Sequence, residues 1–325
     1  MTVSAAGARR VAVMLQAAAA AGIGWQLTQQ AGWHWPAALA AGAVAVLGGL
    51  AVGIALAFAM TQHGTGVLRQ QWPPPAPSTL ASSRQPLPLA EAMRCFALEY
   101  IAVFRMFNWL QPFFSHRRYA APANSLAADQ TPAVLLVHGY ACNHAVWLDL
   151  QPALAAAGYR CEAIDMEPVL GDIDDYADAL LQHIEQITAR TGNAPLLVCH
   201  SMGGLVARAA LAKGAHGVCA GIVTLGTPHH GCALARFGAG RNAWQMRCGG
   251  PWLTTLAAAE SPALRARMVS IFSWHDSISG PPCTSWLDGA RHIALTGIGH
   301  VSLLRDRRAV TAVVEALATL RNKAS

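Results

Sequence analysis

The hydrophobic residues of this chain follow two different patterns. Up to residue 114 they form long stretches with few interruptions, and after residue 132 they form short runs that alternate with segments of helical periodicity. Long stretches are typical of helices in a membrane, whereas short runs between amphipathic helices are typical of strands in a buried parallel sheet. We therefore expect a membrane-associated N-terminal part followed by an α/β domain.

The longest apolar stretch, residues 37–60, contains no charged residue. A helix of this length can cross the hydrocarbon core of a bilayer, which is about 30 Å thick. A shorter, alanine-rich stretch at residues 11–27 follows Arg9 and Arg10. We interpret residues 1–62 as a transmembrane hairpin of two spans, with a cleaved signal peptide as the alternative for the first stretch.

The arginines predict the orientation of this hairpin. Arg9 and Arg10 precede the first stretch, Arg69 and Arg84 follow the second, and residues 28–36 between them carry neither Lys nor Arg. Positive charges beside a span favour the cytoplasmic side of the membrane. We therefore expect a protein of the cell inner membrane whose N-terminus and catalytic domain are cytoplasmic. If only the second stretch crosses the membrane, the catalytic domain lies outside.

Two segments follow the hairpin. Residues 63–88 are rich in Pro and Ser, which predicts a semi-rigid linker. Residues 89–120 are expected to form an amphipathic helical connector, in which Arg94, Glu99 and Arg105 interrupt the apolar residues and disfavour a third span. This helix can lie in the membrane interface with its aromatic residues toward lipid, or it can pack on the catalytic domain.

Residues 121–325 show the alternation of an α/β domain. Short buried strands are expected at residues 133–139, 160–165, 195–200, 218–227, 267–273 and 291–297. Helices are expected at residues 144–159, 174–191, 203–212 and 301–320. This order predicts a mostly parallel sheet with helices on both faces, and functional residues at the carboxyl ends of its strands.

A serine lies at the join between the third strand and the helix that follows it. In the stretch "PLLVCHSMGGLVARAA", Ser201 follows the strand directly, and Gly203 and Gly204 open the helix. A nucleophile elbow, G-x-S-x-G, holds a serine in a strained, accessible turn and needs glycine where two backbones approach closely. Cys199 replaces the first glycine of that pattern. Ser201 is therefore our candidate nucleophile.

A serine nucleophile needs a base, and the base needs an orienting acid. Asp276 and His300 each follow a predicted strand, in the chain order Ser, Asp, His. Asp288 and Glu260 are competing acids that do not directly follow a strand, and the competing base His292 begins a strand and so belongs to the opposite edge of the sheet. The remaining competing bases are His229, His230 and His275.

Attack on an ester carbonyl also needs two donors for the oxyanion. The backbone N–H of Met202, at the start of the helix, is one candidate. The backbone N–H of Tyr140, in the loop after the first strand, is the other.

Five stretches together resemble one known family. They are "VLLVHGY", "VCHSMGGLVAR", "TLGTPHHG", "SWHDSISGPP" and "GIGHVSLL". They are similar to the α/β-hydrolase superfamily, and within it to bacterial triacylglycerol lipases and esterases, over residues 132–321. The resemblance implies an α/β-hydrolase fold, carboxylic ester hydrolysis, and a triad of Ser201, Asp276 and His300. Cys199 and the apolar N-terminus depart from the secreted lipases of this group, and no acidic cluster matches their structural calcium site.

Residues 232–266 form an insertion between two predicted strands. They mix large apolar residues such as Phe237, Trp244 and Trp252 with arginines. An amphipathic lid over the active site has this composition. A fixed cap packed on the core has the same composition, so both interpretations stand at this stage.

Composition restricts the partners and cofactors. Only 12% of the residues are charged, and the net charge of +6 is not concentrated in a basic run, so we expect no nucleic-acid partner. The 8 cysteines show no zinc-binding spacing, so we expect no metal and no cofactor. Most cysteines are expected to be reduced core residues, with a Cys248–Cys283 disulfide as an open alternative. The expected partners are an acyl ester or lipid substrate and membrane lipid, and the sequence indicates no protein partner.

Three functions fit these features. The first is a membrane-anchored serine hydrolase that cleaves acyl esters through an acyl-enzyme. The second is an acyltransferase that uses the same triad with an alcohol as acceptor, and the third is an inactive membrane scaffold. The presence of all three triad candidates favours the first two.

Overall fold

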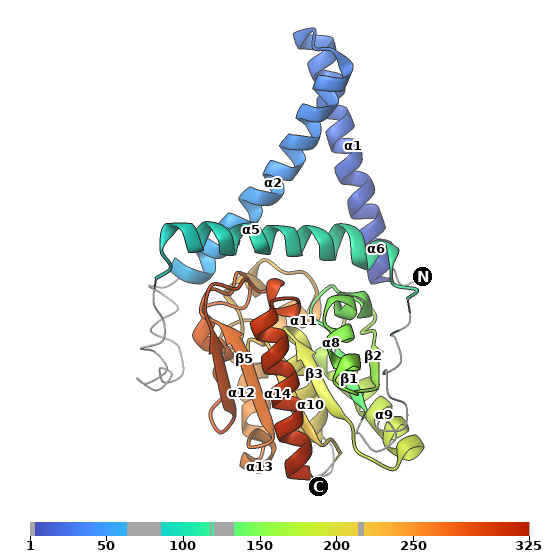
Figure 1. Cartoon of the computed structure of the whole chain (residues 1–325), viewed down its shortest axis with the longest axis vertical. Helices are drawn as coiled ribbons and strands as arrows, with labels where there is room; N and C mark the ends of the chain where they lie inside the picture. Colours follow the sequence, from blue (N-terminus) through green and yellow to red (C-terminus); the bar gives the residue numbers. More distant parts are fainter. Residues whose placement is uncertain (1–3, 64–85, 118, 120–132, 214–217, 325) are drawn as a thin grey trace.

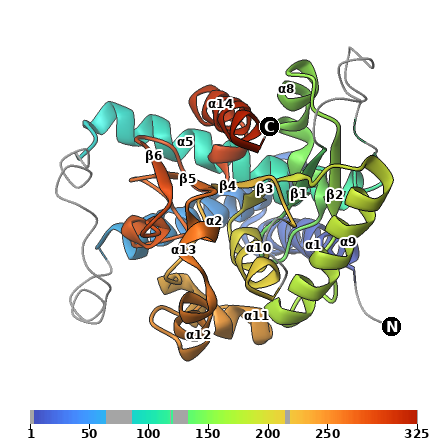
Figure 2. The ribbon, with the colours of Figure 1, turned by 90° about the horizontal axis from the view of Figure 1, so that it is seen from below.

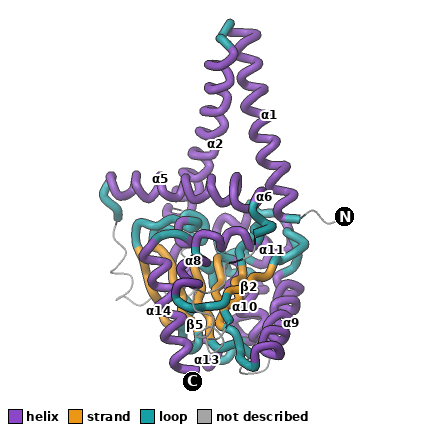
Figure 3. Tube along the Cα trace, turned by 45° about the vertical axis from the view of Figure 1, so that its right-hand side comes forward, coloured by secondary structure: helices purple, strands orange, loops and turns teal. Residues whose placement is uncertain are grey.

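The computed structural model describes residues 4–63, 86–117, 119, 133–213 and 218–324 (Figure 1). The linker predicted at residues 63–88 therefore lies almost entirely outside the described residues. The described part consists of an α/β domain, a long helix lying across one end of it, and a helical hairpin that projects beyond that helix (Figures 1 and 3).

Six parallel strands form the sheet, in the order β2-β1-β3-β4-β5-β6. They are β1 Val134–Val137, β2 Cys161–Ile164, β3 Leu196–His200, β4 Gly221–Leu225, β5 Met268–Ser273 and β6 Arg291–Leu295. All six lie within the ranges predicted from the short apolar runs. The four central strands are buried along their whole length, which explains why their sequences show no polar alternation.

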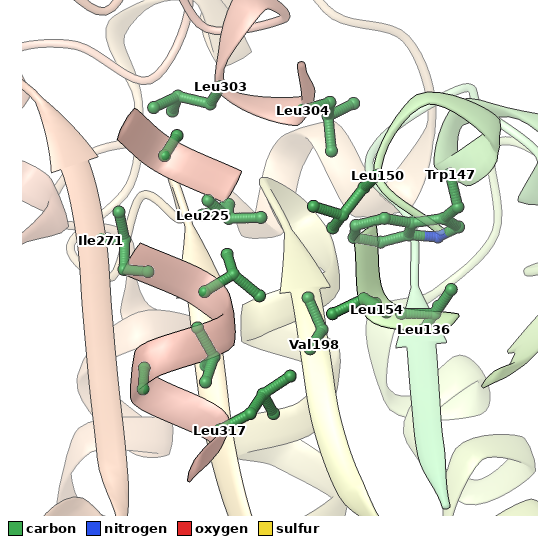
Figure 4. Packing of buried hydrophobic residues seen from close by; sticks show 14 of the residues in the cluster. Leu136, Trp147, Leu150, Leu154, Val198, Leu225, Ile271, Leu303, Leu304 and Leu317 are labelled. Carbon is green, nitrogen blue, oxygen red and sulfur yellow. The ribbon is translucent and has the colours of Figure 1, made fainter. Parts of the chain in front are cut away.

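Helices cover both faces of this sheet (Figure 2). One face carries α9 Ile173–Thr191 and α10 Met202–Lys213, and the other carries α8 Gln151–Ala156 and α14 Arg307–Ala324. Each face has its own apolar cluster. Figure 4 shows the cluster of the second face, where Leu317 and Leu154 lie over Val198, Leu225 and Ile271. The predicted fold class, an α/β sheet with helices on both faces, is confirmed.

Two predicted helices begin later than expected. His144–Asp149 and Ser302–Leu304 are 3₁₀ turns that precede α8 and α14. Asn143 accepts a hydrogen bond from the Ala145 N–H and caps the first 3₁₀ turn, and Asp306 accepts one from the Arg308 N–H at the start of α14. Such side-chain acceptors favour a turn or a helix start over a continuing helix.

The hairpin consists of α1 Ala5–Ala31 and α2 Trp35–His63. Among the described residues, these two helices are long and apolar enough to cross a membrane by length and composition. They approach closely near the connecting turn, where a Cβ added to Gly42 would lie 2.1 Å from the Ala20 carbonyl oxygen. Toward the catalytic domain the two helices diverge (Figures 1 and 3).

The predicted connector is a continuous helix across the carboxyl end of the sheet (Figure 1). It comprises α5 Leu89–Arg105, a π-helical turn at Met106–Leu110, and α6 Gln111–Phe113. The face toward the catalytic domain is buried and contains Cys95, Glu99, Ala102, Met106 and Leu110. The opposite face exposes large apolar side chains, namely Leu89, Met93, Ile101, Phe104, Trp109 and Phe113. The helix thus packs on the domain, as one of the two predictions has it, while its apolar outer face is compatible with the predicted interfacial placement.

The insertion contains α11 Gly240–Gln245, α12 Pro251–Ala259, α13 Pro262–Arg265 and a 3₁₀ turn at Ala233–Arg236. Met246, Leu253 and Leu256 are buried in the apolar cluster beside α10, whereas Phe237 is 75% exposed. This packing favours a cap fixed to the core. Cys248 and Cys283 are both free, so the disulfide considered for them is absent.

Candidate active site

Ser201 occupies the sharp turn between β3 and α10. Its φ is +55°, in the left-handed region that non-glycine residues adopt rarely. The turn needs glycine behind it, because a Cβ on Gly203 would lie 2.2 Å from the Val137 carbonyl oxygen. A Cβ on Gly204 would lie 2.2 Å from Thr227 Oγ1. These clashes explain the two glycines that follow the candidate nucleophile.

The replacement of the first elbow glycine is tolerated by the local packing. Cys199 is fully buried in the apolar cluster on the α9–α10 face. Burial raises the pKa of its thiol well above the usual range, so Cys199 stays protonated and unreactive. The cysteine therefore acts as a small apolar core residue.

Hydrogen bonds hold the backbone of Ser201 in place. Its N–H donates to the Leu225 carbonyl oxygen at 2.9 Å, and its own carbonyl oxygen accepts from Thr227 Oγ1 at 2.8 Å. The Cβ of Ser201 lies 2.9 Å from the position of a Cβ on Gly139. The serine is thus fixed between the ends of β1 and β4.

Asp276 and His300 form a buried pair at the same edge of the sheet. His300 Nδ1 lies 2.8 Å from Asp276 Oδ2. Asp276 Oδ1 accepts hydrogen bonds from the N–H groups of Ile278, at 2.8 Å, and Ser279, at 2.6 Å. These donors fix the carboxylate, which in turn fixes the orientation of the imidazole and the proton on its Nδ1.

The environment of His300 controls its charge. Burial lowers the pKa of His300, but the Asp276 carboxylate and the charge of Glu99 raise it more, so its net pKa is raised. Burial and the neighbouring His300 lower the pKa of His200 well below the usual range, so His200 stays neutral. The two rings are 4.6 Å apart, and this neutrality keeps a second positive charge away from the candidate base.

The end of β4 brings the nucleophile and the pair together. Leu225 holds Ser201, and a Cβ on the next residue, Gly226, would lie 3.0 Å from both Asp276 Oδ2 and His300 Nδ1. Among the described residues, no direct hydrogen bond joins Ser201 Oγ to His300. Catalytic hydrogen bonds are often longer before substrate binds and tighten in the complex.

The two candidate oxyanion donors also lie at this edge. Met202 is the first residue of α10, where backbone N–H groups have no partner within the helix. Tyr140 follows β1 and precedes Ala141, whose φ of +53° turns the loop. The Tyr140 hydroxyl donates to the carbonyl oxygen of Ala239 at 2.8 Å, so its side chain joins this loop to the insertion.

The competing acids and the competing base His292 are occupied elsewhere. Glu260 is buried in an ion pair with Arg208, at 2.5 Å. Asp288 is exposed, and His292 lies near the start of β6, where its Nε2 accepts from the Leu287 N–H at 3.0 Å. The expected position of His292 at the opposite edge is therefore confirmed. No group of His, Cys, Asp and Glu that could hold a metal is found among the described residues.

Three residues of the N-terminal helices contact the loops of this site in ways that the sequence did not predict. Arg9 of α1 donates from Nη2 to the Ala141 carbonyl oxygen at 2.9 Å, and Thr61 of α2 donates from Oγ1 to the Asp276 carbonyl oxygen at 3.0 Å. Glu99 of α5 accepts hydrogen bonds from the loops that carry Asp276 and His300. One signal was available for Glu99, because helical spacing places it on the same face as Cys95 and Ala102, where a solvated charge is unexpected.

Comparison with known proteins supports this description. Residues 132–247 match the family described as the alpha/beta hydrolase fold. A triacylglycerol lipase of Burkholderia plantarii is 32% identical over 127 residues, covering 36% of this chain and 35% of the relative. A triacylglycerol lipase of Pseudarthrobacter phenanthrenivorans is 32% identical over 124 residues, covering 35% of this chain and 38% of the relative. The match thus spans little more than a third of each curated relative.

A solved structure shares the fold across the whole domain. The mature lipase of Bacillus licheniformis superposes with a TM-score of 0.51 at 18% identity, covering 62% of this chain and 96% of that one. With its parallel six-stranded sheet, the domain therefore has the α/β-hydrolase fold, and residues 132–247 match the family of that description. Within that superfamily it is similar to bacterial triacylglycerol lipases and esterases.

Proposed function

We propose that this protein is a membrane-anchored serine hydrolase that cleaves carboxylic esters of lipids. The observation that carries the proposal is the hydrogen-bonded Asp276–His300 pair at the same edge of the sheet as Ser201, which is held at φ +55°. The fold and the lipase relatives support ester hydrolysis as the reaction class.

In the proposed mechanism, Ser201 Oγ attacks the ester carbonyl carbon while His300 Nε2 takes the hydroxyl proton. Asp276 stabilises the imidazolium through Nδ1. The tetrahedral intermediate collapses, the C–O bond of the ester breaks, and His300 gives its proton to the departing alcohol. Water then attacks the acyl-serine with His300 again as base, which releases the acid and restores Ser201.

The backbone N–H groups of Tyr140 and Met202 are the proposed donors to the oxyanion. Tyr140 follows the carboxyl end of β1, and Met202 follows Ser201 after the carboxyl end of β3. Donors fixed in the backbone need no rearrangement as charge develops on the oxyanion. Most of their stabilising effect comes from this fixed orientation.

We assign the hairpin, residues 1–62, as the membrane anchor. Two observations support retention of α1 over its removal as a signal peptide. Arg9 donates to Ala141 next to the proposed oxyanion loop, and Arg10 Nε donates to the Pro112 carbonyl oxygen at 2.7 Å. Cleavage after the first stretch would remove both contacts. The remaining proposed boundaries are a linker at residues 63–88, a connector at 89–120 and the hydrolase domain at 121–325.

The hairpin geometry supports one orientation. The start of α1 and the end of α2 both contact the catalytic domain, and the connecting turn is distant from it (Figure 1). The N-terminus and the catalytic domain then share one side of the membrane, and the flanking arginines favour the cytoplasmic side of the inner membrane.

A lipid ester is the substrate class that this arrangement favours. The carboxyl ends of the strands, where Ser201, Asp276 and His300 lie, face α5 and the hairpin (Figure 1). The outer face of α5 exposes apolar side chains, and an interfacial helix of this kind lies at the headgroup boundary. The active site therefore lies next to the membrane from which a lipid would come.

The reaction is tested with esters of graded acyl length, offered to the purified full chain in detergent. We expect long-chain acyl esters to be hydrolysed, and hydrolysis of short soluble esters alone would contradict a lipid substrate. Adding a primary alcohol tests the acyltransferase alternative, which predicts that the acyl group passes to the alcohol in preference to water. The absence of turnover on every ester would support the scaffold alternative.

The topology is tested by protease accessibility in right-side-out spheroplasts and in inverted membrane vesicles. We expect the catalytic domain to be protected in spheroplasts and digested in inverted vesicles. Digestion in spheroplasts would contradict the proposed orientation and indicate a single span.

A further inference from the structure

Glu99 is a buried carboxylate that extends from α5 into the catalytic loops. Glu99 is fully buried, with 0% of its surface exposed. Glu99 Oε1 accepts from Ser277 Oγ at 2.6 Å and from the Val301 N–H at 3.0 Å, and Oε2 accepts from the Ser302 N–H at 2.9 Å. Its donors thus lie within one residue of Asp276 on one loop and within two residues of His300 on the other.

The catalytic loop is shaped to receive this carboxylate. A Cβ on Gly299 would lie 2.3 Å from Glu99 Cδ, so only glycine allows the close approach. A relay of hydrogen bonds also connects the two loops, because the His300 N–H donates to Ser277 Oγ at 3.4 Å and Ser277 donates to Glu99. The sequence "GIGH" therefore places glycine where Glu99 docks, directly before the candidate base.

From this geometry we infer that Glu99 is a positioning residue of the catalytic triad, supplied by the helix that joins the membrane hairpin to the hydrolase domain. The inference rests on the proposed serine hydrolase function. Glu99 touches neither the substrate nor the reacting atoms, and it acts by fixing the loops of Asp276 and His300 relative to each other. The catalytic centre is then incomplete without α5.

The charge of Glu99 gives this role a distinct signature. Asp276, the neutral His200 and Glu99 are the titratable groups facing His300. Cys95 lies near Glu99, and the charges of Arg308 and Asp306 act on Cys95. Because the Glu99 charge raises the pKa of His300, removing it lowers that pKa.

The test compares Glu99→Gln with Glu91→Gln in the full chain. Glu91 is exposed on the same helix and serves as the matched control. We expect Glu99→Gln to lower kcat roughly 10- to 100-fold with little change in KM, an effect of the size seen when partners that orient a catalytic group are removed. We also expect the acidic limb of the kcat/KM profile to move to lower pH, while Glu91→Gln leaves both quantities unchanged.

A second variant protects the test against misfolding. Gly299→Ala leaves the carboxylate intact but removes the space for it, so we expect a similar loss of kcat. The thermal transition shows whether Glu99→Gln folds. If it does not fold, Ser277→Ala is used instead, because it removes the hydrogen bond to Glu99 with a smaller change of side chain. Ser277→Ala is expected to lower kcat several-fold.

The outcomes separate this inference from the proposed function. Wild-type kcat and an unmoved acidic limb in folded Glu99→Gln, with an inactive Ser201→Ala, would overturn the positioning role alone. Full activity in Ser201→Ala would overturn the serine hydrolase itself. A loss of kcat without any shift of the acidic limb would reduce Glu99 to a structural contact and also contradict the inference.

Discussion

The catalytic domain and the N-terminal hairpin are both built mainly from apolar residues, but the domain buries these residues whereas the hairpin exposes them. In the domain, strands such as β1 and β3 are buried along their whole length. In the hairpin, only 6% of the most apolar window of either helix is buried. Burial away from water stabilises the first region, whereas the exposed apolar surface of the second is compatible with contact to lipid. Composition alone therefore does not distinguish the buried core from the exposed hairpin, but the length of the apolar runs does.

The two regions also differ in where their polar contacts lie. Each N-terminal helix reaches a loop at the catalytic edge, through Arg9 to Ala141, Thr61 to Asp276, and Glu99 to the loops around His300. If the domain were an independent hydrolase carried by a passive anchor, these contacts would be irrelevant to catalysis. The predictions below test first the chemistry of the domain and then the contribution of the helices.

The largest effect is expected from Ser201→Ala. The change removes the oxygen of the proposed nucleophile at a turn and little packing, so turnover should fall by at least about 10³-fold while the thermal transition is kept. Ester hydrolysis and labelling by a fluorophosphonate probe measure the loss. A folded Ser201→Ala protein that still hydrolyses esters at a near-normal rate would show that the nucleophile is another residue.

The next effect is expected from Asp276→Asn. Asparagine keeps the size but offers no charge to the imidazolium and favours the wrong tautomer of His300, so kcat should fall roughly 10²- to 10⁴-fold. Asp288→Asn, at an exposed position, is the control and should change kcat little. If the two variants exchanged their effects, the acid of the triad would have to be reassigned to Asp288.

The pH dependence of the unaltered protein is expected to follow His300. His300 acts as base only when neutral, so kcat/KM should fall as the pH drops through its pKa. Because the carboxylates of Asp276 and Glu99 raise that pKa, the acidic limb should lie above the ordinary value for histidine. The measurement is kcat/KM for a soluble ester across the pH range, and a limb below the ordinary value would contradict the assignment of the base.

The smallest effect is expected from Thr61→Val at the end of α2. Valine removes the hydrogen bond to the Asp276 carbonyl oxygen, but Gln62 Nε2 still donates to the same atom at 3.2 Å. The loss should therefore be about 1 kcal/mol or less, which corresponds to a change in kcat of roughly fivefold at most. Thr28→Val, half-buried near the hairpin turn and distant from the catalytic edge, is the control. Equal effects of both variants would indicate that the contact at Thr61 does not reach the active site.

The sequence allowed the sheet and the triad candidates to be predicted because both depend on local order. Apolar runs of strand length placed every strand, and the positions of Ser201, Asp276 and His300 after strands brought them to one edge. The role of Glu99 could not be predicted in this way. It lies 178 residues from Ser277, so its partners depend on where α5 docks, and no local pattern encodes that position. The lid remained ambiguous for the same reason, since lids and fixed caps share one composition.

The hairpin consists of two helical arms that meet at one hinge. The hinge is the close contact of Gly42 with Ala20, and the far ends of the arms contact the loops of Ala141 and Asp276. The arm from Gly42 to Thr61 measures about 28 Å, so one degree of opening at the hinge moves its end by about 0.5 Å. Displacements of that size at a catalytic group are enough to change a reaction rate. For the proposed membrane-anchored protein, this geometry makes the angle between α1 and α2, and with it the thickness and lateral tension of the bilayer, a variable that acts on the loops of the candidate active site.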